Sequence, residues 1–117
     1  MNCLNQIVLE GNIVHMNSYE TDTSIPVVDV SIAVERKYRN IDGSFGTEVS
    51  YFLVKGFGNV AQIIEKNGNR GCGIRVVGRL TQKRWTDDEG KERSMVYVMA
   101  EYIDFKPKVK KEVPDEG

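Results

Sequence analysis

Aromatic residues stand beside lysines and arginines in three separate segments of the chain. These are RKYR at 36–39, YFLVKGF at 51–57 and KRW at 83–85. Cations bind phosphates, and the release of counterions from the phosphates favours that binding. Flat rings stack on unpaired bases with little sequence preference, at about 1–3 kcal/mol per base. A duplex exposes no base faces of this kind, so the combination is typical of single-stranded nucleic-acid binding.

The spacing of these residues places them together on strand faces, because alternate side chains of a strand point the same way. Tyr51, Lys55 and Phe57 share one face by this spacing. A second set of this kind is Arg75, Arg79, Lys83 and Trp85. We therefore expect two strand faces that mix rings with positive charge.

The candidate residues form two groups. The candidate base-stacking residues are Tyr38, Tyr51, Phe57 and Trp85. The candidate phosphate-binding residues are Arg36, Lys37, Arg39, Lys55, Arg75, Arg79, Lys83, Arg84, Lys91 and Arg93. The structural alternative is that strand aromatics fill the core and strand cations form a solvated face, and it applies most to Phe57.

Sequence signals for catalysis or metal binding are missing. The single histidine, His15, has no nucleophile spaced around it, and GNRGCG at 68–73 matches no phosphate-binding glycine motif. The acidic run at 87–89 belongs to a turn, where such residues are common. Cys3 and Cys72 form no metal-ligand pattern and are expected to be reduced. We expect no enzyme activity, no cofactor and no metal site.

Net charge and hydropathy narrow the possible classes of protein further. Sixteen basic and 17 acidic residues give a formal net charge of −1, which excludes a broadly basic protein but allows a local basic patch. The chain has no apolar run long enough to span a membrane and no signal-peptide pattern at its start. A cytoplasmic protein is the expectation.

Strand patterns dominate the chain, and they must position these residues. Val28, Val30, Ile32 and Val34 alternate with polar or small residues, as in a half-buried strand. The predicted strands cover 4–14, 27–36, 47–57, 74–85 and 94–105, and a short helix covers 59–67, with Asn59 as its N-cap. This order predicts a mainly β fold, a five-stranded OB-fold barrel with one helix between strands three and four. The domain is expected to span 1–105, followed by a short charged disordered tail at 106–117.

Four sequence blocks carry a family resemblance across nearly the whole chain. They are NQIVLEGNIV, AVERKYR, FGNVAQ and VVGRLTQKRWTDDEG. With them the chain resembles the bacterial-type single-stranded DNA-binding protein family. The family's stacking positions fall on Tyr38, Tyr51, Phe57 and Trp85, the same four residues selected above. Tyrosine stands at two positions where tryptophan or phenylalanine is frequent.

The resemblance implies a homotetramer of OB-fold subunits that wraps single-stranded DNA in the bacterial cytoplasm, at the nucleoid. Such a protein protects single strands during replication, recombination and repair. Two features depart from the family pattern: the NGNRGCG connection at 67–73 is longer than the usual glycine turn, and the chain ends KKEVPDEG instead of in an acidic Pro-Phe tip. The second departure puts recruitment of replication and repair partners in doubt.

Three alternatives stay open at this stage. A primosome-type OB protein would bridge replication factors, but such proteins largely lose the stacking residues. An adaptor module would use the barrel surface for protein contacts and show no salt-dependent DNA binding. A single-stranded RNA binder is the third, because stacking does not distinguish ribose from deoxyribose.

Overall fold

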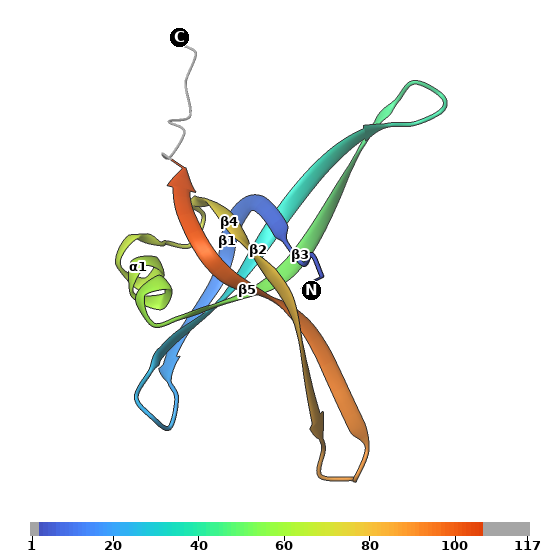
Figure 1. Ribbon diagram of the computed structural model, residues 1–117. Coiled ribbons are helices and arrows are strands. Elements are labelled where there is room, and N and C mark those ends of the chain that lie inside the picture. The colour runs from blue at the N-terminus through green and yellow to red at the C-terminus, as the bar shows by residue number, and fades with distance from the viewer. Residues whose placement is uncertain (1–2, 107–117) are drawn as a thin grey trace.

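Five long antiparallel and parallel strands close into a barrel in the order β1-β2-β3-β5-β4 (Figure 1). The computed structural model describes residues 3–106. The elements are β1 (Ile7–Glu20), β2 (Pro26–Arg39), β3 (Phe45–Phe57), α1 (Asn59–Asn67), β4 (Gly73–Thr86) and β5 (Glu92–Lys106). The predicted five-stranded barrel with one helix between β3 and β4 is therefore confirmed. The predicted tail at 106–117 begins one residue too early, because Lys106 ends β5, and residues 107–117 lie outside the described residues.

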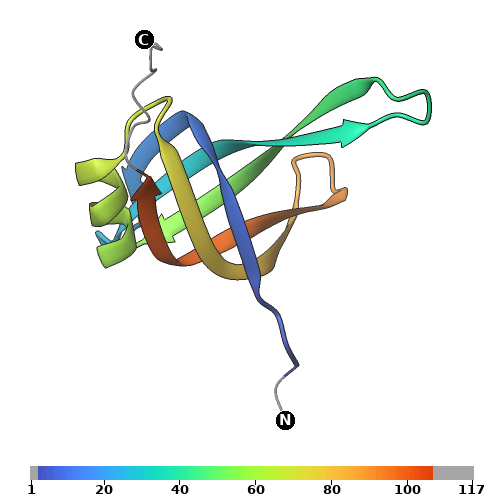
Figure 2. The ribbon, with the colours of Figure 1, turned by 90° about the horizontal axis from the view of Figure 1, so that it is seen from above.

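The barrel core comes from the alternation read in the sequence. Val28, Val30 and Ile32 are completely buried, and the polar residues between them point outward. Val54 of β3 and Val76 of β4 complete the centre of the core. The short helix α1 packs against one end of the barrel (Figure 2).

Two hairpins extend far beyond the barrel. The ends predicted for the fourth and fifth strands lie within two residues of the observed ones, whereas two segments predicted as loops contain strand residues. The segment 15–26, predicted as a loop, continues β1 to Glu20. The predicted loop 37–46 likewise continues β2 to Arg39 and begins β3 at Phe45. These ribbons face water on both sides, so they carry no apolar alternation, and cross-strand pairs such as Arg39 with Phe45 hold them instead. We call the ribbon around 34–50 the β2–β3 arm and the ribbon around 80–97 the β4–β5 arm (Figure 1).

The start of α1 also differs from the prediction. Gly58, with φ of +61°, is the N-cap, and no side chain caps the helix. Asn59 is the first helical residue instead, because the Gly58 N–H bonds to the Pro26 carbonyl and fixes the entry of the chain. The helix buries Ala61 and Ile64, while Ile63 is 45% exposed.

Close backbone contacts leave no room for a side chain at two glycines, and backbone hydrogen bonds hold the glycine-rich connection in place. A Cβ on Gly11 would lie 2.3 Å from the Ala33 carbonyl oxygen, so the backbones of β1 and β2 approach closely there. A Cβ on Gly78 would lie 2.0 Å from the Met99 oxygen, at the point where the β4–β5 register shifts. The 68–73 connection is hydrogen-bonded to Ile13 through the Gly71 N–H and the Cys72 carbonyl, so it extends the barrel edge and is not a free turn.

Candidate nucleic-acid interface

The candidate site lies on the outer surface of four neighbouring strands. A row of paired residues crosses them in order: Asp29 of β2, Lys55 of β3, Met99 of β5 and Arg79 of β4. These side chains alternate with buried ones such as Val54, so they point away from the core. We call the outward-pointing side chains of these four strands the outer face. Its members along β3 and β4 include Tyr51, Lys55, Phe57, Arg79, Lys83 and Trp85.

The predicted stacking rings differ in their access to solvent. Tyr51 is 69% exposed and Trp85 is 42% exposed, and both lie on the outer face. Phe57 is half-buried, at the end of β3 next to α1. Tyr51 pairs with Ala33, so these two side chains share one face of the β2–β3 ribbon. Tyr38, the partner of Gly46, is an odd number of residues from Ala33, so its ring lies on the opposite face from Tyr51. The rings therefore do not form a single flat platform.

The predicted cations divide into two sets. Five of them pair with carboxylates, as Arg36 does with Glu48 at 3.3 Å and Arg79 with Glu101 at 3.2 Å. The other pairs are Lys55–Asp29, Arg75–Glu10 and Arg93–Asp87. Among the described residues, no salt bridge involves Lys37, Arg39, Lys83, Arg84 or Lys91.

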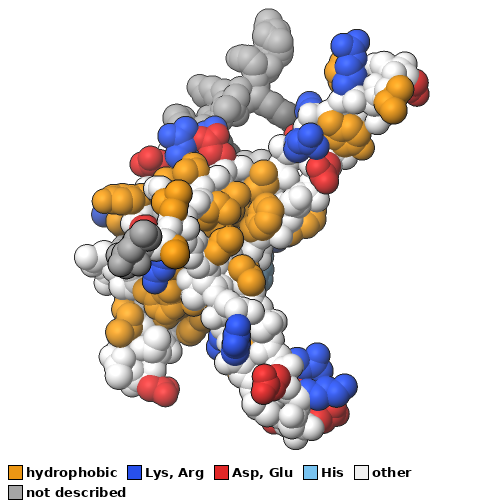
Figure 3. Space-filling view, turned by 45° about the vertical axis from the view of Figure 1, so that its right-hand side comes forward, with side chains coloured by type: hydrophobic (Ala, Val, Ile, Leu, Met, Phe, Trp, Pro, Cys, Tyr) orange, Lys and Arg blue, Asp and Glu red, His pale blue; other side chains and the backbone are white. Residues whose placement is uncertain are grey.

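The five cations without a salt bridge lie on the two arms. Lys37 and Arg39 end β2, Lys83 and Arg84 lie near the end of β4, and Lys91 follows in the turn. Lys83 and Arg84 are successive strand residues, so they point to opposite faces of the ribbon. Figure 3 shows basic side chains along both arms and hydrophobic side chains over the barrel between them. The arms thus present available positive charge on both sides of the barrel surface between them.

Several of these cations lie over aromatic rings. The Lys83 ammonium is 6.0 Å from the centre of the Trp85 ring, and the Arg36 guanidinium is 5.9 Å from that of Tyr38. A cation at this distance is attracted to the electron-rich ring face. The pairing of rings with cations inferred from the sequence is therefore also a contact in space.

Sequence reasoning missed three aromatic residues of this surface. Phe45, which is 75% exposed and lies under the Arg39 guanidinium at 5.3 Å, was hidden in a segment predicted as loop. Tyr97 lies on the outer face of β5, paired with Thr81, but the apolar residues around it resemble a core strand. Tyr19 was also placed in a predicted loop. For Phe45, the sequence did offer one signal: an aromatic residue that faces a basic residue, Arg39, across a short turn.

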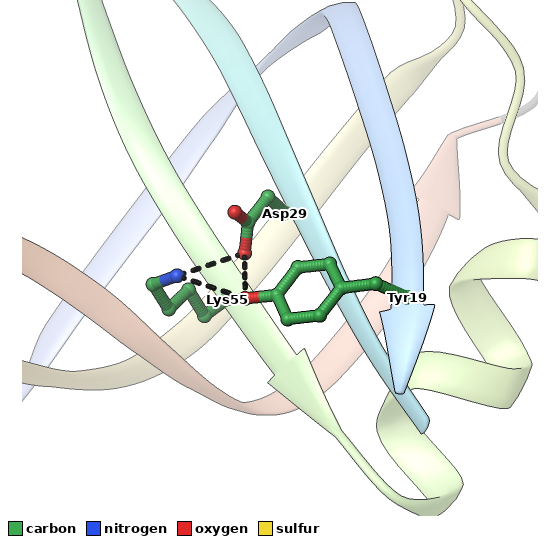
Figure 4. A network of polar contacts seen from close by, with 3 residues as sticks. All are labelled: Tyr19, Asp29 and Lys55. Atoms are coloured by element: carbon green, nitrogen blue, oxygen red, sulfur yellow. Dashed lines mark hydrogen bonds and ion pairs between the residues drawn. The ribbon is translucent and has the colours of Figure 1, made fainter. Parts of the chain in front are cut away.

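Tyr19, Asp29 and Lys55 form a closed polar network on β1, β2 and β3 (Figure 4). The Lys55 ammonium donates to Asp29 Oδ1 at 3.0 Å and to the Tyr19 hydroxyl at 3.2 Å, and that hydroxyl donates to the same Oδ1 at 3.2 Å. Burial opposes the charge of Lys55, but the hydrogen bonds to Asp29 and Tyr19 outweigh it and raise the pKa of Lys55. Lys55 is therefore protonated and already partnered.

The turn of the β4–β5 arm is organised by one carboxylate. Asp87 accepts hydrogen bonds from the Arg93 side chain at 2.8 Å and from the backbone N–H groups of Glu89 and Lys91 at 2.9 Å. These bonds, that of Arg93 first, lower the pKa of Asp87. The acidic run at 87–89 thus builds a turn. Within residues 3–106 no group of three His, Cys, Asp or Glu side chains could hold a metal ion, and no helix could span a membrane.

A second, apolar surface lies next to the outer face, where β4 and β5 continue toward β1. Val8 of β1, Val77 of β4 and Tyr102 of β5 are directly paired and form a row across three strands. Val8 is 57% exposed and Tyr102 is 74% exposed. Ion pairs of Glu10 with Arg75 and with Lys106 lie beside this row. Residues 3–106 leave this apolar patch uncovered.

Residues 4–106 match the Single-strand binding protein family. The chain belongs to this family. A single-stranded DNA-binding protein of Wolinella succinogenes is 33% identical over 85% of this chain and 62% of its own length. One of Aquifex aeolicus is 37% identical over 67% of this chain and 52% of its own length. The chain spans about half the length of the curated relatives it matches.

Solved structures agree with the family membership. The single-stranded DNA binding protein from Thermus aquaticus, in a deletion mutant form, superimposes with a TM-score of 0.79 at 27% identity, over 91% of this chain and 52% of that one. A Plasmodium falciparum SSB in complex with ssDNA has a TM-score of 0.78 at 18% identity, over 92% of this chain and 98% of that one, and supports the fold alone. The family resemblance inferred from the sequence blocks is confirmed. Membership in this family agrees with the expectation that the chain is a binding protein and not an enzyme.

Proposed function

We propose that this chain binds single-stranded DNA with little sequence preference. The observation that carries the proposal is the exposed Trp85 ring with the Lys83 ammonium over it, on the same outer face as the exposed Tyr51 ring. Rings on such a face stack on bases, and cations beside them neutralise phosphates. Family membership supports the same function.

The proposed stacking residues are Tyr38, Tyr51, Phe57 and Trp85. The cations predicted from the sequence are the candidates for phosphate contacts, apart from Lys55, whose ammonium is already partnered by Asp29 and Tyr19. The five on the arms without a carboxylate partner are the most available of these. We assign the protein to the protection of single strands in replication, recombination and repair, in the bacterial cytoplasm at the nucleoid.

We further propose that copies of the chain associate, as a homotetramer, through the Val8–Val77–Tyr102 row. An exposed apolar row across three strands is the kind of surface that a second copy would cover. Light scattering after gel filtration should give a tetramer mass for the full chain. Tyr102→Glu should lower that mass, because it would bury a charge in the interface; a monomer mass for the unchanged chain would remove the proposal.

The test of DNA binding uses Trp85, which is the only tryptophan, as its reporter. Titration with oligo-dT should quench the tryptophan emission strongly, and a duplex of equal length should quench it much less. Affinity should fall as salt rises, because counterion release drives the binding. Equal quenching by the duplex, or no quenching by either ligand, would overturn the proposal. A parallel titration with oligo-rU decides whether the chain prefers DNA or RNA.

A further inference from the structure

The Lys55 ammonium is enclosed by groups of the protein itself. Asp29 and the Tyr19 hydroxyl accept its hydrogen bonds, and the rings of Tyr19 and Tyr97 lie 5.8 and 5.4 Å from Nζ (Figure 4). The Lys55 side chain is only 13% exposed. A carboxylate, a hydroxyl and two rings thus surround a cation that lies within the outer face.

This enclosure separates Lys55 from the other paired cations. The side chains of Arg36, Arg79 and Arg93 are 69%, 46% and 55% exposed in their ion pairs. Exposed pairs of this kind contribute little to stability, so a DNA phosphate can replace the carboxylate at small cost. The Lys55–Asp29 pair is far less exposed, and the Tyr19 hydroxyl bonds to both of its members. A phosphate would have to break the whole network.

We propose that Asp29 withholds Lys55 from DNA, acting as an internal anion in the place of a phosphate and limiting how many phosphates the outer face binds. The inference rests on the proposed DNA binding. It follows that removing the negative charge of Asp29, with its shape kept, creates a new phosphate site. Asp29→Asn keeps an oxygen that accepts from Tyr19 and Lys55 but leaves the ammonium charge unbalanced. The flexible four-carbon stem of lysine then lets the ammonium reach a phosphate.

The experiment compares the unchanged chain, Asp29→Asn, Lys55→Gln and the double variant, each bound to oligo-dT and to inorganic polyphosphate over a salt series. Asp29→Asn should bind both ligands more tightly at low salt. Its slope of log affinity for oligo-dT against log salt should steepen by about 0.7, the value for one more phosphate on a single strand. Lys55→Gln should leave the slope of the unchanged chain as it is and should cancel the gain in the double variant.

Glu65→Gln is the matched control. It makes the same change in net charge on the exposed surface of α1, away from the outer face, so it separates a local effect from a general one. A slope for Asp29→Asn equal to that of the unchanged chain would overturn the inference. A salt slope that is shallower by about 0.7 in Lys55→Gln alone would also overturn the inference, since Lys55 would then already bind a phosphate in the unchanged chain.

Two further readouts keep the result decisive. If Asp29→Asn does not fold, as judged by its thermal unfolding, Lys55→Gln in the unchanged background still decides whether Lys55 contributes to the slope. If the unchanged chain binds no oligo-dT, the proposed function fails. In that case the polyphosphate affinities of the unchanged chain and Asp29→Asn still test whether Asp29 withholds a phosphate site.

Discussion

The Tyr38 ring lies directly over Gly46, its cross-strand partner on the β2–β3 arm. A Cβ built on Gly46 would be 2.4 Å from Cζ of Tyr38 and 2.6 Å from its hydroxyl oxygen. The absence of a side chain at Gly46 is therefore what allows the ring to rest against the ribbon. The position of one proposed stacking ring is thus set by a residue that has no side chain.

Gly46→Ala should displace the Tyr38 ring and weaken DNA binding, with little change in stability. The contacting atoms are the far end of a flexible side chain, so the ring can move at small cost to the fold. We expect a loss of about 1 kcal/mol or less in the free energy of oligo-dT binding, below the value of one complete base stack. Fluorescence titration measures it, and in a Tyr38→Ala background the same substitution should have no further effect.

The same substitution at Gly78 should instead destabilise the fold. Here the Cβ would meet the Met99 carbonyl oxygen at 2.0 Å, and a backbone atom cannot turn aside as a ring can. Overpacking of this kind costs about 1–3 kcal/mol, and we expect the upper end of that range. Urea unfolding should show a lower midpoint for Gly78→Ala than for Gly46→Ala. Equal midpoints would mean that β4 and β5 separate easily at this point.

The barrel was predictable because its strands alternate, whereas the hairpin segments at 15–20 and 37–46 were not. Val28, Val30 and Ile32 must face one core, and that requirement leaves a period of two in the sequence. Residues of these segments face water on both sides, so a polar stretch such as 15–20 resembles a loop although it is a paired strand. Most of the candidate cations lie on the two arms, and only the strands of the β4–β5 arm were predicted to within two residues of their ends, so the composition of the site could be predicted better than its extent.

The partners of the cations were also beyond sequence reasoning. Lys55 was a candidate phosphate contact because of its neighbours along β3, but its charge is balanced by Asp29 across the strand pair. Cross-strand partners depend on the register between two strands, which the core pattern and the connecting turn set together, so the neighbours of Lys55 along β3 alone do not identify Asp29. The structural alternative for Phe57 depends on the same information, since its half-burial comes from its place at the end of β3 near α1.

Tyr51→Ala should weaken oligo-dT binding and leave stability almost unchanged. The ring is 69% exposed, so its removal leaves no cavity in the core. The expected loss is about 1–3 kcal/mol in the free energy of binding, the value of one base stack. Ile63→Ala, which removes an exposed apolar side chain from α1, is the control and should bind as the unchanged chain does. Equal affinities for the two variants would exclude Tyr51 from the interface.

Lys83→Ala and Arg84→Ala test whether both faces of the β4–β5 arm meet DNA. The two side chains point to opposite faces of the ribbon, and neither has a carboxylate partner among the described residues. If each contacts one phosphate, the salt slope for oligo-dT falls by about 0.7 in each variant and by twice that in the double variant. Lys66→Ala on α1 should not change it. An unchanged slope in the double variant would place the phosphates elsewhere.

Acid should loosen the turn of the β4–β5 arm through Asp87. The hydrogen bonds from Arg93 and from the Lys91 and Glu89 backbone lower the pKa of Asp87 in the folded protein below its ordinary value of 3.8. A carboxyl with a lowered pKa contributes its stabilisation in full above the ordinary value and loses it as pH falls through the folded-state pKa. The unfolding free energies of the unchanged chain and Asp87→Asn should therefore differ most above about pH 4 and converge in stronger acid. Glu10 and Asp42 titrate in both proteins, so their contributions cancel in this difference.

The amide chemical shifts of Glu89 and Lys91, whose N–H groups donate to Asp87, report the same titration directly. Their common midpoint should lie below 3.8, and a midpoint at or above that value would show that these bonds do not hold the turn in solution.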